Sequence, residues 1–433
     1  MRSATRRVVT AGTAAAFGVL ALMITAHGQA KIACDPDNGG ITLPQGFCAL
    51  VVANDVGTAR HMAVAPNGDL YVATQSQGGR GTPERGGGVV ALRDTNGDGK
   101  FDMREQVGTG STTGVALHDG YLYLAHPRTI ERFKMTAGQL TPTGSAETIV
   151  TDLPPEAQHQ DKGIAFDGKG NLYINVGAPS NACQNPDRRP GAKGQDPCPI
   201  LEKHGGVWKF SDSKTNQTQD MGGMRFATGL RQFPAIAWHG SALYIVMNNR
   251  DQLDVFWPDK FTAQDNAERP AEPMYRATGG ENFGWPFCFY DYQQKKEVLN
   301  PEYGGDGKET GKCASFTQPI AVFPAHSAPV DLMFYTGTQF PKKYQGGAFI
   351  AFHGSWNRAP MPQDGYNVTF QPFSGDKPSG QFEIFAKGFA GTDKLMNPNQ
   401  AAARADGVAQ GPDGSLYISD SQHGKIWRVM YKK

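Results

Sequence analysis

DGSLYISD, at residues 413–420, reads as a turn followed by a short strand in which apolar and polar residues alternate. Variants of this phrase occur at 67–74 (NGDLYVAT), 119–126 (DGYLYLAH) and 169–176 (KGNLYINV). In each variant an apolar strand precedes the turn, and a Leu-Tyr pair opens the strand that follows it. The pattern is typical of a β-hairpin, and the chain repeats it.

The hairpin occurs six times. Its copies occupy residues 61–74, 113–126, 162–176, 234–247, 328–354 and 406–420. Successive copies begin roughly 50 to 95 residues apart, which is too long for a solenoid repeat and suits a four-stranded propeller blade with insertions. We therefore predict an all-β fold, a six-bladed β-propeller of four-stranded blades, over residues 31–433 as a single domain. A β-sandwich with accidental internal similarity is the alternative.

The first thirty residues differ in composition from the rest of the chain. Three arginines precede an apolar run at 11–24, AGTAAAFGVLALMI, that is short for a membrane span, and small residues follow up to Ala30. We predict a signal peptide over residues 1–30 and a periplasmic or secreted protein without a membrane span. TRRVVT at 5–10 half-resembles a twin-arginine signal, so the export route stays open, and an uncleaved anchor is the alternative.

Charge and composition limit the partners. The predicted mature chain carries 39 basic and 41 acidic residues, because three of the 42 Lys and Arg residues lie in the signal peptide. This near-neutral balance argues against nucleic acid or an anionic membrane as the main partner. The 54 Gly and 29 Pro residues are scattered along the chain as turn signals, which favours many short strands.

All six cysteines lie in the predicted exported part and fall into three pairs that are close in sequence. The simplest pairing is Cys34–Cys48, Cys183–Cys198 and Cys288–Cys313. About fifteen connectivities are possible for six cysteines, and proximity alone favours this one. Each bridge that closes a loop of about 15 residues would contribute about 3 kcal/mol in the chain-entropy model.

Cationic or imidazole side chains precede the first strand in five of the six copies. The residues at this position are Arg60, Thr112, His159 with Lys162, Arg231, His326 and Arg404. In a ring of blades, equivalent positions point to the same end of the central channel. Several fixed cations there would bind an anion that carries several carboxylates or phosphates.

Residues 94–105, DTNGDGKFDMRE, match a calcium-binding loop position by position. The predicted ligands are Asp94, Asn96, Asp98, Lys100 through its carbonyl, Asp102 and Glu105. The flanking residues read as strand and turn rather than as two helices. We therefore expect a structural calcium ion that fixes a blade connection, and an acidic turn without an ion is the alternative.

Four phrases resemble the soluble pyrroloquinoline-quinone (PQQ)-dependent sugar dehydrogenases, and most closely their sorbosone dehydrogenase-like branch. They are GLRQFPAIAWH (229–239), GGENFGWP (279–286), FYTGTQFPKKYQGGAFIAFHGSWNR (334–358) and DGVAQGPDGSLYISDSQHGKIWRV (406–429). The resemblance extends from about residue 45 to the end of the chain. It implies a six-bladed propeller that oxidises a sugar or sugar aldehyde with PQQ and calcium, and an electron acceptor for the reduced quinone.

The resemblance also implies roles for individual residues. His159 matches the base that takes the proton of the sugar hydroxyl, and Arg231 matches the arginine that polarises the quinone and holds one of its carboxylates. The stretch 247–254, MNNRDQLD, corresponds to the segment that holds calcium against the quinone. The remaining residues implied to bind the cofactor are Arg60, Lys162, Gln232, Arg250, His353, Arg358 and Arg404. The family usually has Asn where this chain has Gln232.

Two other functions stay open at this point. A six-bladed lactonase would use a divalent metal on the channel axis, but it needs carboxylates and Asn where this chain has mostly cations. A non-catalytic binding propeller would have kept the fold and lost the cofactor. Gln232 and Lys162, at which the chain departs from the usual pattern, favour that third function.

Overall fold

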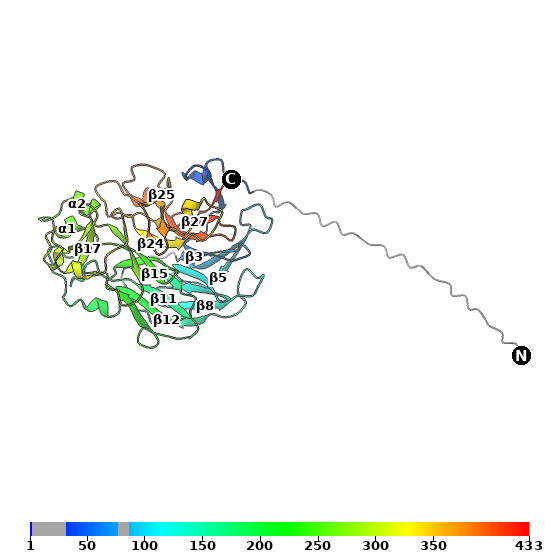
Figure 1. Ribbon diagram of the computed structural model, residues 1–433, viewed down its shortest axis with the longest axis horizontal. Helices are drawn as coiled ribbons and strands as arrows, with labels where there is room; N and C mark the ends of the chain where they lie inside the picture. The colour runs from blue at the N-terminus through cyan, green and yellow to red at the C-terminus, as the bar shows by residue number, and fades with distance from the viewer. Residues whose placement is uncertain (2–31, 77–85, 157, 433) are drawn as a thin grey trace. The chain divides into compact units, whose positions relative to one another are not determined.

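The computed structural model describes residues 1, 32–76, 86–156 and 158–432, and the described residues from Ile32 onward belong to one compact unit. The predicted signal peptide, apart from its first residue, lies outside the described residues. The described strands form six four-stranded antiparallel sheets and two small two-stranded ones. Each four-stranded sheet is a blade, and the blades form a ring (Figure 1). The predicted all-β, six-bladed propeller is therefore confirmed.

The blades take their strands almost in chain order. Blade 1 contains β2 (Thr58–Val64), β3 (Leu70–Gln75), β4 (Gly88–Arg93) and β5 (Met103–Val107). Blade 2 contains β6 (Gly114–His118), β7 (Tyr121–Ala125), β8 (Ile130–Lys134) and β9 (Glu147–Val150). Blade 3 contains β10 (Ile164–Phe166), β11 (Asn171–Val176), β12 (Gly206–Ser211) and β13 (Met224–Thr228).

The other three blades carry the larger insertions. Blade 4 contains β14 (Gln232–His239), β15 (Ala242–Asn248), β16 (Glu272–Ala277) and β19 (Ala321–Phe323). Blade 5 contains β20 (Pro329–Phe334), β21 (Ala348–Phe352), β22 (Asn367–Gln371) and β25 (Glu383–Ala386). Blade 6 contains β26 (Ala405–Gln410), β27 (Leu416–Asp420), β28 (Ile426–Tyr431) and β1 (Phe47–Ala53).

The insertions hold the remaining elements. The two small sheets pair β17 (Cys288–Asp291) with β18 (Lys296–Leu299) and β23 (Phe373–Ser374) with β24 (Lys377–Pro378). The two α-helices in the described residues are α1 (Leu253–Phe256) and α2 (Ala263–Glu268), between β15 and β16. Short 3-10 turns occupy Asn38–Gly40, Pro199–Glu202, Pro301–Tyr303, Gly311–Ser315, Lys342–Tyr344 and Pro398–Gln400.

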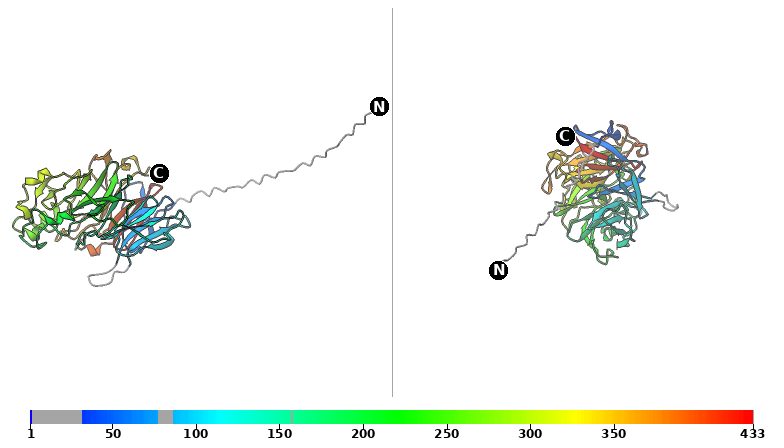
Figure 2. Two further views of the ribbon diagram at one scale, coloured as in Figure 1. Left: turned by 90° about the horizontal axis from the view of Figure 1, so that it is seen from below. Right: turned by 90° about the vertical axis from the view of Figure 1, so that its right-hand side faces the viewer.

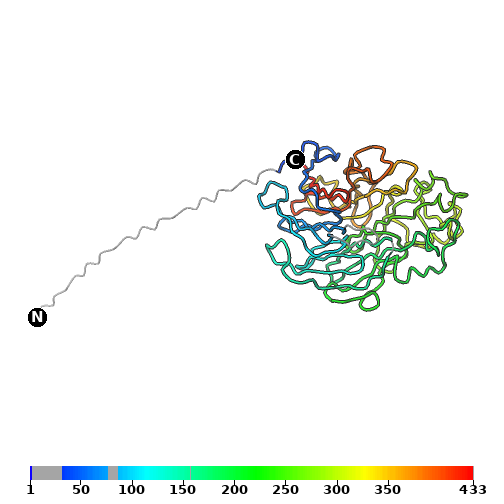
Figure 3. Tube along the Cα trace, turned by 180° about the vertical axis from the view of Figure 1, so that it is seen from behind, coloured from blue at the N-terminus to red at the C-terminus, as the bar shows by residue number. Residues whose placement is uncertain are grey.

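The ring closes because a strand near the start of the described chain pairs with the strand at its end. The first strands of the blades contact one another in cyclic order, from β2 through β6, β10, β14, β20 and β26 back to β2. The tube in Figure 3 follows this path around the ring, from blue to red. In blade 6 the early strand β1 pairs antiparallel with the last strand β28, which Figure 2 shows as blue beside red. β1 therefore joins the start of the ring to its end.

The Leu-Tyr pair of the repeat faces two blade interfaces at once, because successive side chains of a strand point to opposite sides. In blade 2, Leu122 packs in the cluster shared with blade 1, and Tyr123 packs in the cluster shared with blade 3. Leu172 and Tyr173 do the same one blade further on. The repeated pair is thus the residue pair that attaches each blade to both of its neighbours.

Each of the six blade interfaces has a hydrophobic cluster of its own. The largest lies between blades 5 and 6 and is rich in aromatic rings. In blade 5 Ala348 and Phe349 stand where the other blades have Leu and Tyr, and they divide between the two interfaces in the same way. The copy of the repeat at 328–354 therefore performs the same packing with different residues.

All three predicted disulfides are present, between Cys34 and Cys48, Cys183 and Cys198, and Cys288 and Cys313. The first ties the segment before β1 to β1 itself. The second closes part of the insertion between β11 and β12, and the third closes the insertion that contains β17 and β18. No helix among the described residues has the length and hydropathy that crossing a membrane requires.

Phe47 tests the closure of the ring. Its buried ring makes edge-on contacts with Phe340, Phe385 and Tyr431 from blades 5 and 6, with centroids 4.8 to 4.9 Å apart. We expect Phe47→Ala to lower the free energy of unfolding by about 3–5 kcal/mol, because it leaves a cavity among rigid neighbours. Ile384→Ala serves as the control, since Ile384 precedes Phe385 on β25 but its side chain is 52% exposed. Denaturant titrations in which the two variants lose equal stability would contradict this role for Phe47.

Candidate active site

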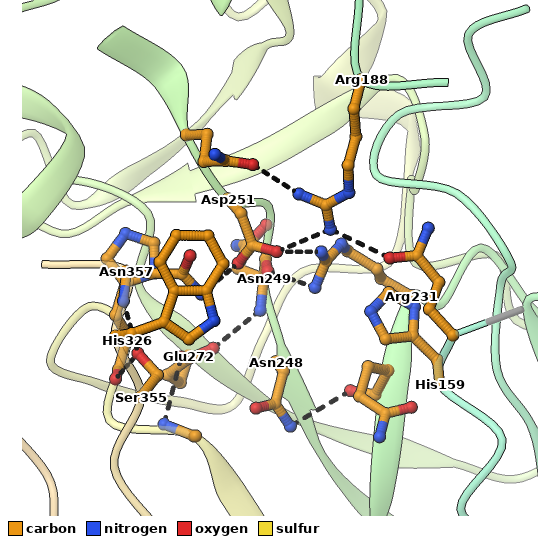
Figure 4. A pocket seen from close by; sticks show the side chains of 15 residues that line it. His159, Arg188, Arg231, Asn248, Asn249, Asp251, Glu272, His326, Ser355 and Asn357 are labelled. Atoms are coloured by element: carbon orange, nitrogen blue, oxygen red, sulfur yellow. Dashed lines mark hydrogen bonds and ion pairs between the residues drawn. The ribbon is translucent and has the colours of Figure 1, made fainter. Parts of the chain in front are cut away.

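A cavity of about 550 Å³ lies where the connections of blades 3, 4 and 5 meet (Figure 4). Most of its wall comes from segments that precede or follow strands, and Gln232, Asn248 and Glu272 stand at the ends of β14, β15 and β16. The lining residues are Gln158, His159, Arg188, Arg231, Gln232, Asn248, Asn249, Asp251, Gln252, Glu272, His326, Ala328, Ser355, Trp356 and Asn357. Three of the six predicted blade-start positions, His159, Arg231 and His326, are therefore brought together.

His159 has a fixed tautomer. Its Nδ1 lies 2.6 Å from the carbonyl oxygen of Ala178, and because a carbonyl only accepts, Nδ1 carries the proton and donates it. The lone pair then stands on Nε2. Burial, with the positive charge of Arg231, lowers the pKa of His159 to about 3, so the ring is neutral at physiological pH. Gly177 permits this arrangement, since a Cβ there would stand 2.4 Å from the His159 carbonyl oxygen.

Arg231 lies at the centre of a buried charge network. Its terminal nitrogens donate to the Asn249 carbonyl oxygen at 2.8 Å and to Asp251 Oδ2 at 2.6 Å. Arg188 donates to the same Asp251 oxygen at 2.9 Å. Burial alone would raise the pKa of Asp251, but the two guanidinium groups lower it well below its ordinary value. Arg188 also lies near a second carboxylate behind the wall, with Nε 3.7 Å from Asp187 Oδ2, whereas Asp251 is the one carboxylate of the described residues that forms an ion pair with Arg231.

The insertion closed by the Cys183–Cys198 disulfide supplies Arg188. The guanidinium of Arg188 also donates to Gln252 Oε1 at 2.7 Å and to Gln158 Oε1 at 3.0 Å. Gln158 immediately precedes His159. The insertion is therefore joined by hydrogen bonds to both sides of the cavity, to the segment with the histidine and to the segment with Asp251.

Several buried polar atoms in the cavity walls have no hydrogen-bond partner among the residues that the structure describes. They are Arg231 Nε, Gln232 Oε1 and Asn357 Oδ1. Burial is costly for an unpaired polar atom, and such atoms in a cavity are available to a ligand. Beside them, burial raises the pKa of Glu272 to about 8, although its oxygens accept from the backbone N–H groups of Asn249 and Ala328.

Four residues of the wall hold their backbone in the left-handed region although they are not glycine. They are His159 (φ 63°), Gln252 (φ 58°), His326 (φ 58°) and Ala328 (φ 57°). Such conformations cost energy and persist where the surrounding structure enforces them, which is common at functional sites. Their concentration around one cavity supports the assignment of this cavity as the site.

The other predicted blade-start cations do not line this cavity. Arg60 donates to Asp406 at 2.8 Å and to Asp161 at 3.1 Å. Lys162 is buried in an ion pair with Glu156, with Nζ and Oε2 2.7 Å apart. Each of these cations is therefore neutralised by a carboxylate that the repeat pattern did not include.

The remaining predicted cofactor contacts also lie outside the cavity wall. Arg404 donates to the carbonyl oxygens of His353 and Gly354, and the His353 ring bonds to Ser421 Oγ at 2.7 Å. Arg358 donates to the carbonyl oxygens of Pro362 and Ala267.

Arg250 is completely buried, and it donates to Glu302 at 2.6 Å and to Asn300 at 3.0 Å. Its neighbour Asp251 faces the cavity instead. Cofactor binding by Arg250 and the other residues outside the wall stays a prediction.

The residues of the predicted calcium loop lie in the turn between β4 and β5. Asp94 accepts from the N–H groups of Gly97 and Gly99, at 2.7 and 2.8 Å, and Asp98 accepts from Lys100 N–H at 2.8 Å. Asn96 accepts from Asp98 N–H, and Asp102 accepts from Thr95. Glu105 lies on β5 and accepts from Thr141 Oγ1 at 2.6 Å.

The sequence pattern did not single out Arg188, Asp251, Glu272 or Asn357. The family resemblance pointed to the stretch 247–254, but within it only Arg250 was predicted to bind the cofactor. Adjacent side chains point in different directions, so an error of one position separates a buried structural cation from the carboxylate of the site.

A family model described as TrAA12-like matches residues 41–432. The chain belongs to the TrAA12-like family. This result and the solved relatives confirm the resemblance to soluble PQQ-dependent sugar dehydrogenases, whereas the sorbosone dehydrogenase-like branch stays a prediction.

Two curated relatives match parts of this TrAA12-like chain. An uncharacterized protein of Borreliella burgdorferi is 34% identical over 154 residues, which is 35% of this chain and 37% of the relative. A PQQ-dependent pyranose dehydrogenase of Coprinopsis cinerea is 26% identical over 192 residues, which is 38% of this chain and 25% of the relative. The matched parts thus span well under two thirds of either relative.

Solved structures match over most of their length. The holo PQQ domain of the Coprinopsis cinerea pyranose dehydrogenase has a TM-score of 0.68 at 17% identity, over 90% of this chain and 97% of that one. A calcium structure of a Trichoderma reesei enzyme of carbohydrate-active family AA12 has a TM-score of 0.72 at 16% identity, over 90% and 97%. The apo aldose sugar dehydrogenase of Escherichia coli has a TM-score of 0.57 at 18% identity, over 89% and 99%. At these identities the likeness concerns the fold.

The protonation of His159 gives a direct test of the site. We expect its ring to stay neutral, with the proton on Nδ1, at about pH 5, where an ordinary histidine with a pKa of about 6.5 is mostly protonated. Nitrogen-15 NMR of the folded protein measures this, with the His159 signals assigned by comparison with His159→Gln. Because the folded-state pKa of about 3 lies below the unfolded one, His159 should reduce stability as the pH falls from 6.5 toward 3. Nitrogen-15 chemical shifts typical of a protonated imidazolium ring at pH 5 would contradict the neutral state of His159.

The calcium prediction is tested by stability. If the 94–105 loop binds calcium, adding the ion to chelator-treated protein should raise the melting temperature, because a ligand that binds only the folded state stabilises it. Asp98→Ala combined with Glu105→Ala should remove this increase. Asp306→Ala, in an exposed turn elsewhere, is the matched acidic control. An equal increase in the double variant would show that calcium binds elsewhere.

Proposed function

We propose that this protein is an exported PQQ-dependent dehydrogenase that oxidises a sugar or sugar aldehyde. The observation that carries the proposal is the neutral His159, with its Nε2 lone pair unengaged in the same cavity as the cationic Arg231. A base and a fixed cation in one enclosed space are what oxidation of an alcohol next to an anionic quinone requires. The sorbosone dehydrogenase-like branch, and sorbosone or an aldose as substrate, is the narrower form of the proposal.

The donor set of the cavity fits PQQ. The quinone carries three carboxylates, and two guanidinium groups, Arg188 and Arg231, line the cavity beside one ionised carboxylate, Asp251. The unpartnered Arg231 Nε is a donor for an anionic oxygen, and Gln232 Oε1 is an acceptor for a ring N–H. When bound, PQQ supplies the two-electron acceptor that takes the hydride from the sugar carbon.

His159 receives the proton of the sugar hydroxyl. Oxidation of a hydroxyl to a carbonyl releases a proton from oxygen, and the Nε2 lone pair accepts it. The Ala178 carbonyl oxygen holds Nδ1–H, so it fixes the ring's orientation and stabilises the imidazolium once it forms. Burial and, after it, the Arg231 charge lower the pKa of His159, so an anion bound beside Arg231 would offset the second of these causes and make His159 a stronger base.

Arg231 holds its position through Asp251 and the Asn249 carbonyl oxygen rather than through the ligand. A preorganised cation stabilises charge that develops on a quinone oxygen without having to move. Calcium, which a Trichoderma reesei relative contains, would be bound in this chain at 94–105, or along 247–254 as the family resemblance implies. The proposed function also requires an electron acceptor that reoxidises the reduced quinone.

The three disulfides support export to the periplasm or outside the cell, because such bonds persist in oxidising compartments.

The residues of the central channel favour a dehydrogenase over a metal-dependent lactonase. Asp161 and Asp406 both pair with Arg60, so a guanidinium stands between the carboxylates. Within the described residues, the one group of three potential metal ligands is His118, Asp119 and Asp212, and these lie outside the cavity.

Variants of His159 and Arg231 test the proposed function. His159→Ala should bind PQQ with parental affinity and lose turnover by about 10²–10⁴-fold, the usual contribution of a positioned base. Arg231→Lys should weaken PQQ binding by roughly ten- to a hundredfold, because lysine keeps the charge but loses the planar donor geometry. Absorbance titration with PQQ and single-turnover reduction by sugar measure the two effects.

Arg104→Lys is the control for the second variant, because Arg104 lies on the outer strand of blade 1, outside the cavity wall, and donates to the carbonyl oxygens of Asn54 and Asp55. It should bind PQQ like the parent. Reduction of bound quinone by His159→Ala at the parental rate would eliminate the histidine as the base. A parent protein that binds no PQQ at all would favour the non-catalytic binding propeller.

A further inference from the structure

Trp356 is unusual among the residues that line the cavity. It belongs to the cavity wall, yet it is 53% exposed, and it is one of few large apolar side chains on the described surface. The other residues of the wall are predominantly polar or charged. An indole that remains exposed at the rim of a polar cavity offers a flat apolar face to whatever enters.

The backbone around Trp356 is held in place on both sides. Ser355 Oγ donates to the His326 carbonyl oxygen at 2.9 Å, and the Asn357 carbonyl oxygen accepts from Asn266 Nδ2 at 2.7 Å. Asn357 Nδ2 donates to Asp251 Oδ1 at 2.8 Å. Trp356 is therefore exposed on a rigid segment, so a ligand that stacks on it need not first order the backbone.

Asn357 provides a polar atom next to the indole. Because Asp251 is an acceptor, the amide nitrogen of Asn357 must face it, and this fixes the amide oxygen on the other side. That oxygen, Oδ1, is buried and has no partner. In Figure 4, Asn357 and His159 lie on opposite sides of the view, with Asp251 and Asn249 between them. Both residues line the same cavity, so a molecule that fills it meets the wall that carries the base and the wall that carries Asn357.

We propose that Trp356 and Asn357 form the subsite that binds the sugar ring: the indole stacks on the apolar C–H face of a cyclic sugar, and Asn357 Oδ1 accepts a hydrogen bond from one of its hydroxyls. This inference rests on the proposed function. A ring-closed sugar has a flat C–H face and hydroxyls around its edge, which matches an apolar platform next to an unpaired acceptor. An open-chain aldehyde has no such face. The subsite therefore selects cyclic over acyclic substrates.

Three variants test the subsite. Trp356→Ala should raise KM for a cyclic aldose roughly tenfold and change kcat little, because stacking affects binding rather than the proton transfer. Trp356→Phe should recover part of the loss, since it keeps an aromatic face. Met396→Ala is the matched control, because Met396 is also 53% exposed but does not line the cavity. KM for an open-chain aldehyde should be unchanged in all three.

A second measurement does not depend on turnover. Methyl glucopyranoside, whose anomeric oxygen is blocked, should quench the tryptophan fluorescence of the parent and of Met396→Ala, but should bind Trp356→Ala roughly tenfold more weakly. PQQ titration and melting temperature should be the same for all variants.

The outcomes separate the subsite from the proposed function. Equal affinity for the glycoside and equal KM in parent and Trp356→Ala would overturn the subsite, even if the enzyme is active. Weaker PQQ binding by Trp356→Ala would overturn it as well, by assigning the indole to the cofactor. Failure of the parent to bind PQQ would instead refute the proposed function. In that case weaker binding of the glycoside by Trp356→Ala would still support a sugar subsite, and equal binding would overturn it.

Discussion

The packing of each blade against the next is the constraint on which the rest of this protein depends. A four-stranded sheet has two apolar faces and is not stable alone, so each blade needs a neighbour on both sides. The Leu-Tyr pair meets this need with two adjacent residues, as Leu122 and Tyr123 show. Ring closure through β1 provides the last neighbour. Because the interfaces set the position of every inner strand, they also set where the connections between blades begin and end.

The site is built on this scaffold from parts that the repeat does not share. Arg231 is almost fully buried and depends on Asp251, and removal of one partner from such a pair leaves an uncompensated charge. The left-handed backbone at His159 and His326 is also unfavourable by itself. The blade interfaces are extensive and rigid, so the scaffold can tolerate both costs. Polar atoms without partners, such as Arg231 Nε, are the part of the site that a ligand would complete.

The sequence allowed the fold to be predicted because the blade contacts recur in it. The same hairpin appears in every blade, so the number of blades, their strands and the nearby disulfide partners followed from pattern and proximity. His159 and Arg231 were found because they precede an inner strand, and the cavity contains both. The pattern could not show which cations are neutralised, since Asp406 and Glu156 pair with Arg60 and Lys162 only in three dimensions. Arg188 and Asn357 come from insertions, where no repeat indicates direction.

A ring of six similar blades would offer six similar places for a binding site. A single active site therefore requires that the blades differ around the ring. Arg60 breaks the symmetry at the axis, where it joins Asp161 and Asp406 and thereby links the connections around blades 1, 3 and 6. The long connections of blades 3 to 5 break it on the other side, because they bring Arg188 and Asp251 to Arg231. The counter-charges therefore differ between the two sides: Arg60 pairs with two carboxylates, whereas Arg231 pairs with Asp251 alone and Arg188 lies near both Asp251 and Asp187. Under the proposed function, this arrangement of counter-charges, rather than the cations alone, selects the side of the ring on which the anionic cofactor binds.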